Sequence, residues 1–117
     1  MRALRFHGSR DLRLEEIAPP PGPSGSEVLI APAVCGICGT DLHEYLDGPR
    51  RTWPERHPHP LTGAVLPQIL GHEVAAEVVA VGPDVRAAAP GDRVSVMPVV
   101  TCGRCHPCRA EIGRAHV

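Results

Sequence analysis

Three cysteines in the last part of the chain have the spacing of metal ligands. Cys102, Cys105 and Cys108 follow one another at intervals of three residues. They would not share one side of an extended strand, but a glycine-containing loop can curl three thiolates around one Zn²⁺ ion at about 2.3 Å. Free thiols and an iron–sulfur cluster are the alternatives. The residues after Cys108 lack the Cys-Pro that ferredoxin-type motifs place there, which favours a structural zinc site.

A second set of candidate ligands is spread along the chain. Cys38 lies in the segment Gly-Ile-Cys-Gly-Thr-Asp-Leu-His at residues 36–43, and His72 and Glu73 follow in Gly-His-Glu. A cysteine, a distant histidine and a neighbouring carboxylate are typical of a catalytic zinc, which takes three protein ligands and leaves one position open. Alone, a cysteine is commonly a small core side chain. The order of these residues, followed by the cysteine triplet, favours the metal interpretation.

The composition limits what the chain can be. It has 117 residues, 43% hydrophobic and 3% aromatic, so we expect one domain with a core of small and β-branched side chains. No apolar run approaches the roughly 18 residues of a membrane helix, and no secretory signal opens the chain. We therefore expect a cytoplasmic protein without membrane contact. The formal net charge of −1 argues against a nucleic-acid partner.

Two phosphate-binding patterns are excluded within these residues. All 12 basic residues are arginine, so a P-loop lysine is missing, and no Gly-x-Gly occurs, so a dinucleotide fingerprint is missing.

The first part of the chain predicts strands. Residues 1–6 and 12–17 predict a hairpin around a five-residue turn at 7–11. Residues 27–34 predict a third strand, in which Pro32 indicates a sheet edge or a bulge.

The rest of the chain predicts one helix and further strands. Residues 40–46 predict a short helix with Thr40 or Asp41 as its N-cap. A long polar, proline-rich excursion follows at residues 48–67. Two more strands are expected, at residues 69–81 and 93–100. Short strands between Gly/Pro turns are typical of a small β-barrel or sandwich.

Taken together, these motifs resemble the N-terminal, GroES-like catalytic domain of zinc-dependent medium-chain alcohol dehydrogenases. The resemblance covers residues 1–110 and is carried by residues 36–43, by Gly-His-Glu, by Pro-Gly-Asp-Arg-Val at 90–94 and by the cysteine triplet. The segment 57–63 is similar to that of 2,3-butanediol dehydrogenases. The resemblance implies a mostly β, GroES-like small barrel with one short helix, as part of a two-domain enzyme whose Rossmann domain is not in these residues.

The resemblance also implies roles for single residues. Cys38 and His72 match the first two ligands of the catalytic zinc, and Glu73 matches the adjacent acid that approaches the metal. Asp41 matches an outer carboxylate that orients His72. The family's proton relay is matched by Thr40 and His43, and its structural zinc ligands by Cys102, Cys105 and Cys108.

The implied function is that of an oxidoreductase. It transfers hydride from a secondary alcohol, diol or polyol to NAD(P), with Zn²⁺ and NAD(P) as cofactors, and its full-length form is a homo-oligomer. The alternative is a non-catalytic zinc-binding GroES-like module, which would not need Cys38, Thr40, His43 or His72. A zinc-free relative of the quinone reductase type would lack the cysteine triplet and the His-Glu pair.

The chain departs from the family pattern at its end. The third catalytic zinc ligand and the nucleotide-binding domain are expected beyond residue 117, and position 116, where the family has the fourth structural cysteine, holds His116. Because residues 111–117 have lost the family's character, we expect native sequence to end near Ala110 and the remainder to be a read-through tail. We expect the 117-residue chain to be inactive by itself.

Overall fold

The computed structural model describes residues 1–49 and 57–110. Its first element is an antiparallel hairpin of β1 (Arg2–Gly8) and β2 (Asp11–Glu16), which confirms the predicted hairpin. The turn is tighter than the predicted five residues, because the strands extend to Gly8 and Asp11. Ser9 and Arg10 make the turn, and Arg10 has a φ of 60°, a left-handed conformation that suits a tight reversal.

The second sheet has three antiparallel strands in the order β3-β4-β5, formed by β3 (Val28–Gly36), β4 (Glu73–Val81) and β5 (Arg93–Ser95). Strand β3 lies at the edge of this sheet, and its register with β4 shifts between Pro32 and Val34. Both the edge position and the irregularity expected from Pro32 are therefore present.

Two strands are shorter than predicted. Strand β4 begins at Glu73 rather than at residue 69, because Gly71 has a φ of +114° and interrupts the extended backbone. Strand β5 ends at Ser95 rather than at residue 100.

The predicted helix is present as α1 (Gly39–Asp47), but its N-cap is Cys38 and not Thr40 or Asp41. Asp41 is instead the third helical residue, and its Oδ2 accepts the backbone N–H of Cys38 at 2.9 Å. A second short helix that the sequence did not predict, α2 (His106–Arg109), follows Cys105.

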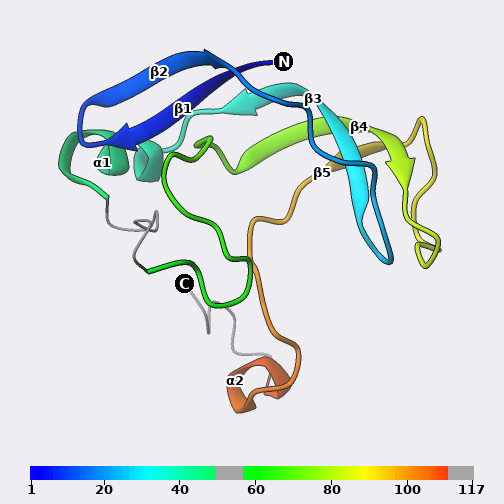
Figure 1. Cartoon of the computed structure of the whole chain (residues 1–117). Coiled ribbons are helices and arrows are strands. Elements are labelled where there is room, and N and C mark those ends of the chain that lie inside the picture. The colour runs from blue at the N-terminus through cyan, green and yellow to red at the C-terminus, as the bar shows by residue number, and fades with distance from the viewer. Residues whose placement is uncertain (50–56, 111–117) are drawn as a thin grey trace.

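The elements lie in three parts (Figure 1). The hairpin β1–β2 has its turn beside α1, the sheet β3-β4-β5 forms the other side, and α2 lies apart from both sheets. The chain is mostly strand, as predicted, and has a second short helix beside the one expected. The described residues form two separate sheets and do not close into a barrel. An isolated bridge pairs Phe6 of β1 with Gln68, which lies in the segment before β4.

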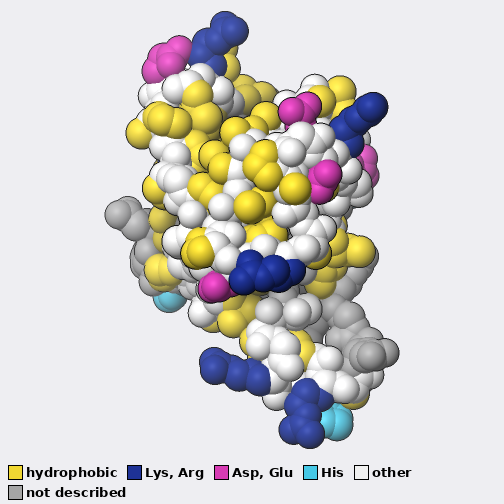
Figure 2. Space-filling model, turned by 90° about the vertical axis from the view of Figure 1, so that its right-hand side faces the viewer, with side chains coloured by type: hydrophobic (Ala, Val, Ile, Leu, Met, Phe, Trp, Pro, Cys, Tyr) yellow, Lys and Arg dark blue, Asp and Glu magenta, His cyan; other side chains and the backbone are white. Residues whose placement is uncertain are grey.

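The buried core is small and includes an aromatic ring. Ala3, Phe6, Ala76 and Val78 are its buried hydrophobic members within residues 1–49 and 57–110. Phe6 is fully buried, so the expectation of a core of small and β-branched side chains is wrong at this position. Other large apolar side chains are exposed, and Figure 2 shows hydrophobic side chains gathered on one face of the molecule. No helix in the described part of the chain is long and apolar enough to cross a membrane.

Candidate metal centres

The separated candidate ligands come together between the start of α1 and the start of β4. The Sγ atom of Cys38, a ring nitrogen of His72 and a carboxylate oxygen of Glu73 all lie within 4.8 Å of one another. We call this group the assembled cluster. Two ligand atoms on one tetrahedral zinc ion are about 3.5 Å apart, so small side-chain movements bring the three donors to an ion.

Asp41 connects the two halves of the assembled cluster. Its Oδ2 accepts the Cys38 N–H, and its Oδ1 lies 3.5 Å from Nδ1 of His72. The Asp41 side chain is only 14% exposed, so its position is well defined by its surroundings. A carboxylate on Nδ1 fixes the tautomer and leaves Nε2 as the nitrogen for a metal.

Two glycines make room for this arrangement. Gly36 pairs with Glu73 across β3 and β4, and a Cβ at Gly36 would collide with the Glu73 carboxylate. A Cβ at Gly71 would collide with Sγ of Cys35. The residue before His72 therefore lies close to the Cys35 side chain of β3.

The two predicted relay residues lie in different surroundings. The Thr40 hydroxyl is 3.7 Å from Sγ of Cys38 and thus borders the assembled cluster. His43 points along the helix to Asp47, with 3.8 Å between Nδ1 and Oδ2, and is 71% exposed. The structure therefore places Thr40 at the candidate site and His43 at the solvent.

The cysteine triplet forms a second cluster within one loop, which we call the loop cluster. The Sγ atoms of Cys108 and Cys102 are 3.8 Å apart, and those of Cys105 and Cys108 are 3.3 Å apart. Thiolates on one tetrahedral zinc ion are about 3.8 Å apart. Gly103, with a φ of +68°, makes the turn, and the Cys105 N–H donates to Sγ of Cys102 at 3.4 Å.

The crowding of sulfur atoms changes the acidity of Cys105. A backbone hydrogen bond from Cys108 lowers the pKa of the Cys105 thiol. Its sulfur contacts with Cys108 and Cys102, together with desolvation, outweigh that effect and raise the pKa. Deprotonation of adjacent thiols is unfavourable because it places negative charges side by side. A bound cation is therefore needed to hold three thiolates together.

Several other residues lie outside these clusters. Cys35 lies on an edge strand and is exposed. His106 is exposed. His59 is only partly exposed, and its Nδ1 accepts the N–H groups of Leu61 and Thr62. The predicted tail 111–117, with His116, and part of the 48–67 excursion lie outside the described residues.

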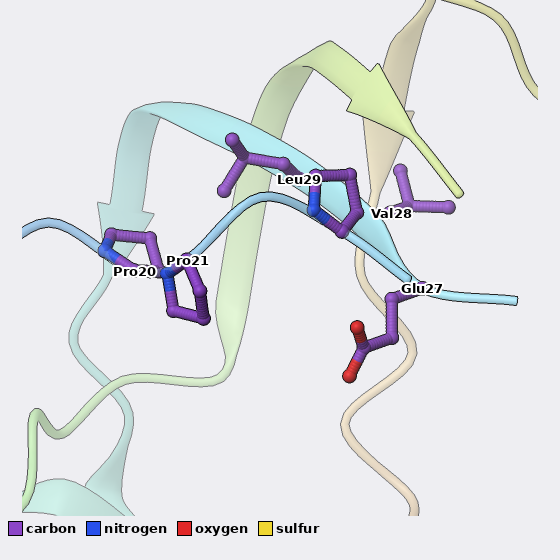
Figure 3. A pocket seen from close by; sticks show the side chains of 6 residues that line it. Pro20, Pro21, Glu27, Val28 and Leu29 are labelled. Atoms are coloured by element: carbon purple, nitrogen blue, oxygen red, sulfur yellow. The ribbon is translucent and has the colours of Figure 1, made fainter. Parts of the chain in front are cut away.

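A surface pocket of about 320 Å³ is lined by side chains of the segment 20–29, none of which belongs to either cluster (Figure 3). Its walls are mostly apolar, and its carboxylate, Glu27, already accepts the N–H and the hydroxyl of Ser24. The lining residues are Pro20, Pro21, Pro23, Glu27, Val28 and Leu29. The pocket therefore offers no metal-binding or catalytic group of its own.

A comparison with protein families decides the relationship. A family model for the alcohol dehydrogenase GroES-like domain matches residues 24–116. The chain belongs to this family. The match contains every residue of the assembled and loop clusters, whereas the hairpin β1–β2 precedes it.

Similar proteins agree with this membership. (R,R)-butanediol dehydrogenase of Bacillus subtilis is 48% identical over 99 residues, which are 85% of this chain and 28% of the relative. Sorbitol dehydrogenase of the same organism is 41% identical, over 93% of this chain and 28% of the relative. The crystal structure of the B. subtilis 2R,3R-butanediol dehydrogenase superposes with a TM-score of 0.78 and 46% identity, covering 86% of this chain and 28% of that one. This GroES-like chain thus spans little more than a quarter of the length of the relatives it matches.

Proposed function

We propose that the chain is the zinc-binding part of an oxidoreductase that oxidises a secondary alcohol, diol or polyol with NAD(P). The observation that carries the proposal is the assembled cluster. It joins a thiol, an imidazole and a carboxylate, the donor set of an open zinc site, and Asp41 holds the imidazole. Relatives named for butanediol and for sorbitol support a substrate with neighbouring hydroxyl groups.

The donor atoms fit a zinc ion at each cluster. In the assembled cluster, Cys38, His72 and Glu73 would hold the ion and leave one position for the substrate oxygen. Zinc bound there would act as a Lewis acid on an alcohol or carbonyl oxygen. The loop cluster would hold a structural ion through Cys102, Cys105 and Cys108.

The remaining site residues would handle the proton. The Thr40 hydroxyl borders Cys38 and can accept the proton of an alcohol bound beside it. His43 is exposed on the same helix and can pass a proton to the solvent, because histidine side chains serve as proton shuttles. A bound nicotinamide cofactor would supply the hydride-accepting chemistry.

Three further features complete the proposal. Residues 1–110 form the GroES-like domain and 111–117 the tail, and the full-length enzyme is a homo-oligomer. None of the five cysteines forms a disulfide, which supports a reducing compartment such as the cytoplasm.

Zinc analysis of the chain tests the ligand assignment. The wild-type chain is expected to bind two zinc ions, and Cys38→Ala is expected to bind one. Cys35→Ala is the matched control, because this cysteine lies three residues earlier and outside both clusters, and it should keep both ions. Two ions in Cys38→Ala would overturn the assignment.

A chimera tests the activity. The matching region of B. subtilis (R,R)-butanediol dehydrogenase is replaced by residues 1–110 of this chain, and oxidation of 2,3-butanediol and sorbitol with NAD and NADP is measured. Activity that disappears in the Cys38→Ala chimera supports the oxidoreductase. A folded chimera that binds zinc but oxidises neither substrate would favour the non-catalytic zinc-binding module.

A further inference from the structure

The hairpin β1–β2 contacts the helix that supplies one half of the assembled cluster. At its turn, the Ser9 hydroxyl donates to the carbonyl of Leu46 at 2.8 Å, and the Arg10 N–H donates to the carbonyl of Tyr45 at 2.6 Å. The last carbonyls of a helix have no partner within the helix. The turn therefore holds the C-terminal end of α1, the helix whose N-cap is Cys38.

The same hairpin contacts the segment that supplies the other half. Phe6 and Gln68 exchange two backbone hydrogen bonds, of 2.7 and 3.0 Å. Nη2 of Arg5 donates to the carbonyl of Pro67 at 2.8 Å. Pro67 and Gln68 lead directly into the short segment that ends in His72.

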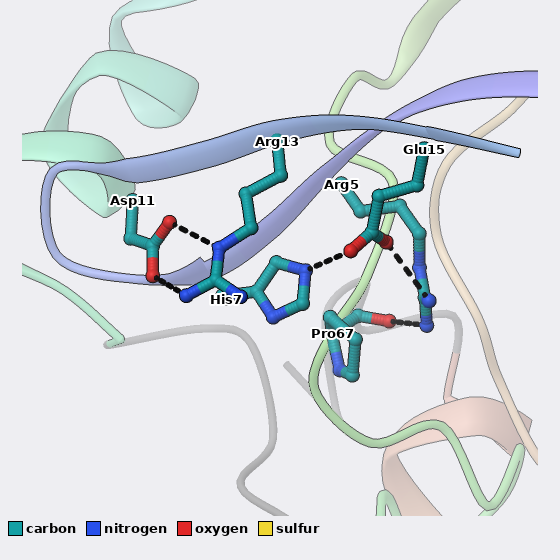
Figure 4. A network of polar contacts seen from close by, with 6 residues as sticks. All are labelled: Arg5, His7, Asp11, Arg13, Glu15 and Pro67. Carbon is teal, nitrogen blue, oxygen red and sulfur yellow. Dashed lines mark hydrogen bonds and ion pairs between the residues drawn. The ribbon is translucent and has the colours of Figure 1, made fainter.

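A polar network on the hairpin holds the Arg5 guanidinium in position (Figure 4). Nη1 of Arg5 donates to Glu15 Oε2 at 3.2 Å, and the other oxygen of Glu15 lies 3.0 Å from Nε2 of His7. The three side chains are 21–29% exposed, so they are shielded more than an ordinary surface pair. The planar fork of arginine can reach Glu15 and the Pro67 carbonyl at once, which a lysine cannot do.

A second ion pair on the hairpin provides a natural contrast. Arg13 binds Asp11 through two contacts of 2.8 and 2.6 Å, and these side chains are 56% and 40% exposed. Both partners belong to β2 (Figure 4). The Arg13 pair therefore contributes to the hairpin without contacting the segment before His72.

We propose that the hairpin β1–β2 aligns the two halves of the assembled cluster, and that Arg5 is a positioning residue that acts on His72 through Pro67. This inference rests on the proposed zinc function. It assigns a role to residues that lie outside the family match at 24–116. The hydrogen bonds and ion pairs described above for the hairpin reach α1 and the segment before His72 and do not include the loop cluster, which should therefore not depend on Arg5.

Cobalt titration of the chain tests this proposal. Two backgrounds separate the clusters: Cys105→Ser leaves the assembled cluster, and Cys38→Ala leaves the loop cluster. Arg5→Ala is expected to lower the Co²⁺ affinity of the assembled cluster about tenfold, the lower end of what lost support around a ligand costs. It should leave the loop cluster unchanged. The Co²⁺ affinity of Arg5→Lys at the assembled cluster should lie between those of Arg5→Ala and the parent. The control Arg13→Ala should have the parent's Co²⁺ affinity in both backgrounds.

Each outcome decides one point. Equal Co²⁺ affinities in Arg5→Ala and Arg13→Ala, or an equal loss at both clusters, would overturn the positioning role. If the Cys105→Ser parent itself binds no Co²⁺, the proposed function fails instead. Should circular dichroism show that Arg5→Ala is unfolded, Ser9→Ala tests the contact with α1 in the same way. A folded Ser9→Ala chain with parental affinity in the assembled cluster would then overturn the alignment role.

Discussion

The two candidate metal clusters differ in how much of the fold each one requires. The loop cluster takes its ligands from residues 102–108, where one glycine turn brings the sulfur atoms within 3.3–3.8 Å. The assembled cluster takes Cys38 from the start of α1 and His72 and Glu73 from the start of β4. Local spacing is enough to build the first, whereas the second exists only when helix, hairpin and sheet are in place.

The same contrast extends to the groups around the ligands. In the assembled cluster, Asp41 bonds the backbone of one ligand and approaches the ring of another, so the ligands are arranged before an ion arrives. In the loop cluster, each sulfur lies beside another sulfur, and the sulfur contacts contribute to raising the pKa of Cys105. The first arrangement is suited to an open, reactive site and the second to an ion that closes a loop.

Removing the buried Phe6 ring should produce the largest difference in metal retention between the two clusters. Phe6 is fully buried and its backbone pairs with Gln68, so Phe6→Ala is expected to cost about 3–5 kcal/mol of stability. The assembled cluster should lose its metal under conditions in which the loop cluster keeps its own. Urea unfolding and zinc analysis measure the two effects. Equal metal loss from both clusters would show that the loop depends on the core as well.

Removing one sulfur from the loop cluster should have the reverse effect: the loop cluster loses its zinc ion and the assembled cluster keeps its own. A structural zinc site contributes roughly 10–16 kcal/mol in small zinc domains, so losing one of the three ligands, about a third of that energy, should weaken zinc binding by the loop cluster more than a hundredfold. Cys105→Ser should therefore lose one zinc ion and keep the other, with Cys35→Ser as the unaffected control. Loss of both ions would contradict the independence of the clusters.

Neutralising the bridging carboxylate acts on the assembled cluster alone. An asparagine at position 41 cannot accept from both Cys38 and His72, so Asp41→Asn should lower metal affinity there by about 10–100-fold. Asp47→Asn, at the exposed end of the same helix, serves as control. Cobalt titration in the Cys105→Ser background measures both. Matching affinities for the two variants would exclude the bridging role.

The smallest effect on stability is expected at Glu27, which belongs to neither cluster. Hydrogen bonds from the N–H and hydroxyl of Ser24 hold the pKa of Glu27 below its usual 4.5. Because the folded-state pKa is lowered, the stabilisation is present above that usual value and is lost as the pH falls through the folded-state pKa. Glu27→Gln should therefore lower stability slightly at neutral pH and not in strong acid, without changing either metal affinity. Urea unfolding at the two pH values checks this, and a difference that persists in acid would contradict it.

Sequence patterns predicted the local features well. The hairpin, the helix α1 and the spacing of Cys102, Cys105 and Cys108 all depend on neighbouring residues, and the structure contains each of them. The predicted N-cap of α1 was wrong, because Asp41 lies inside the helix and accepts the N–H of Cys38.

Contacts between distant segments could not be predicted in the same way. Nothing in the periodicity indicates that Phe6 pairs with Gln68 or that Arg5 reaches Pro67, because these contacts depend on how the hairpin lies against the rest of the fold. The early start expected for β4 was wrong for a related reason. Only the fold shows that Gly71 turns the backbone against Cys35 just before His72.

Unfolding of the cobalt-loaded chain in urea tests the central contrast most directly. Circular dichroism follows the sheets, and thiolate-to-cobalt absorption follows the two clusters, which the Cys38→Ala and Cys105→Ser chains assign. The assembled cluster is expected to release its ion together with the loss of the sheets, and the loop cluster to release its ion at higher urea. Release of both ions in one transition, or release from the loop cluster first, would contradict the account.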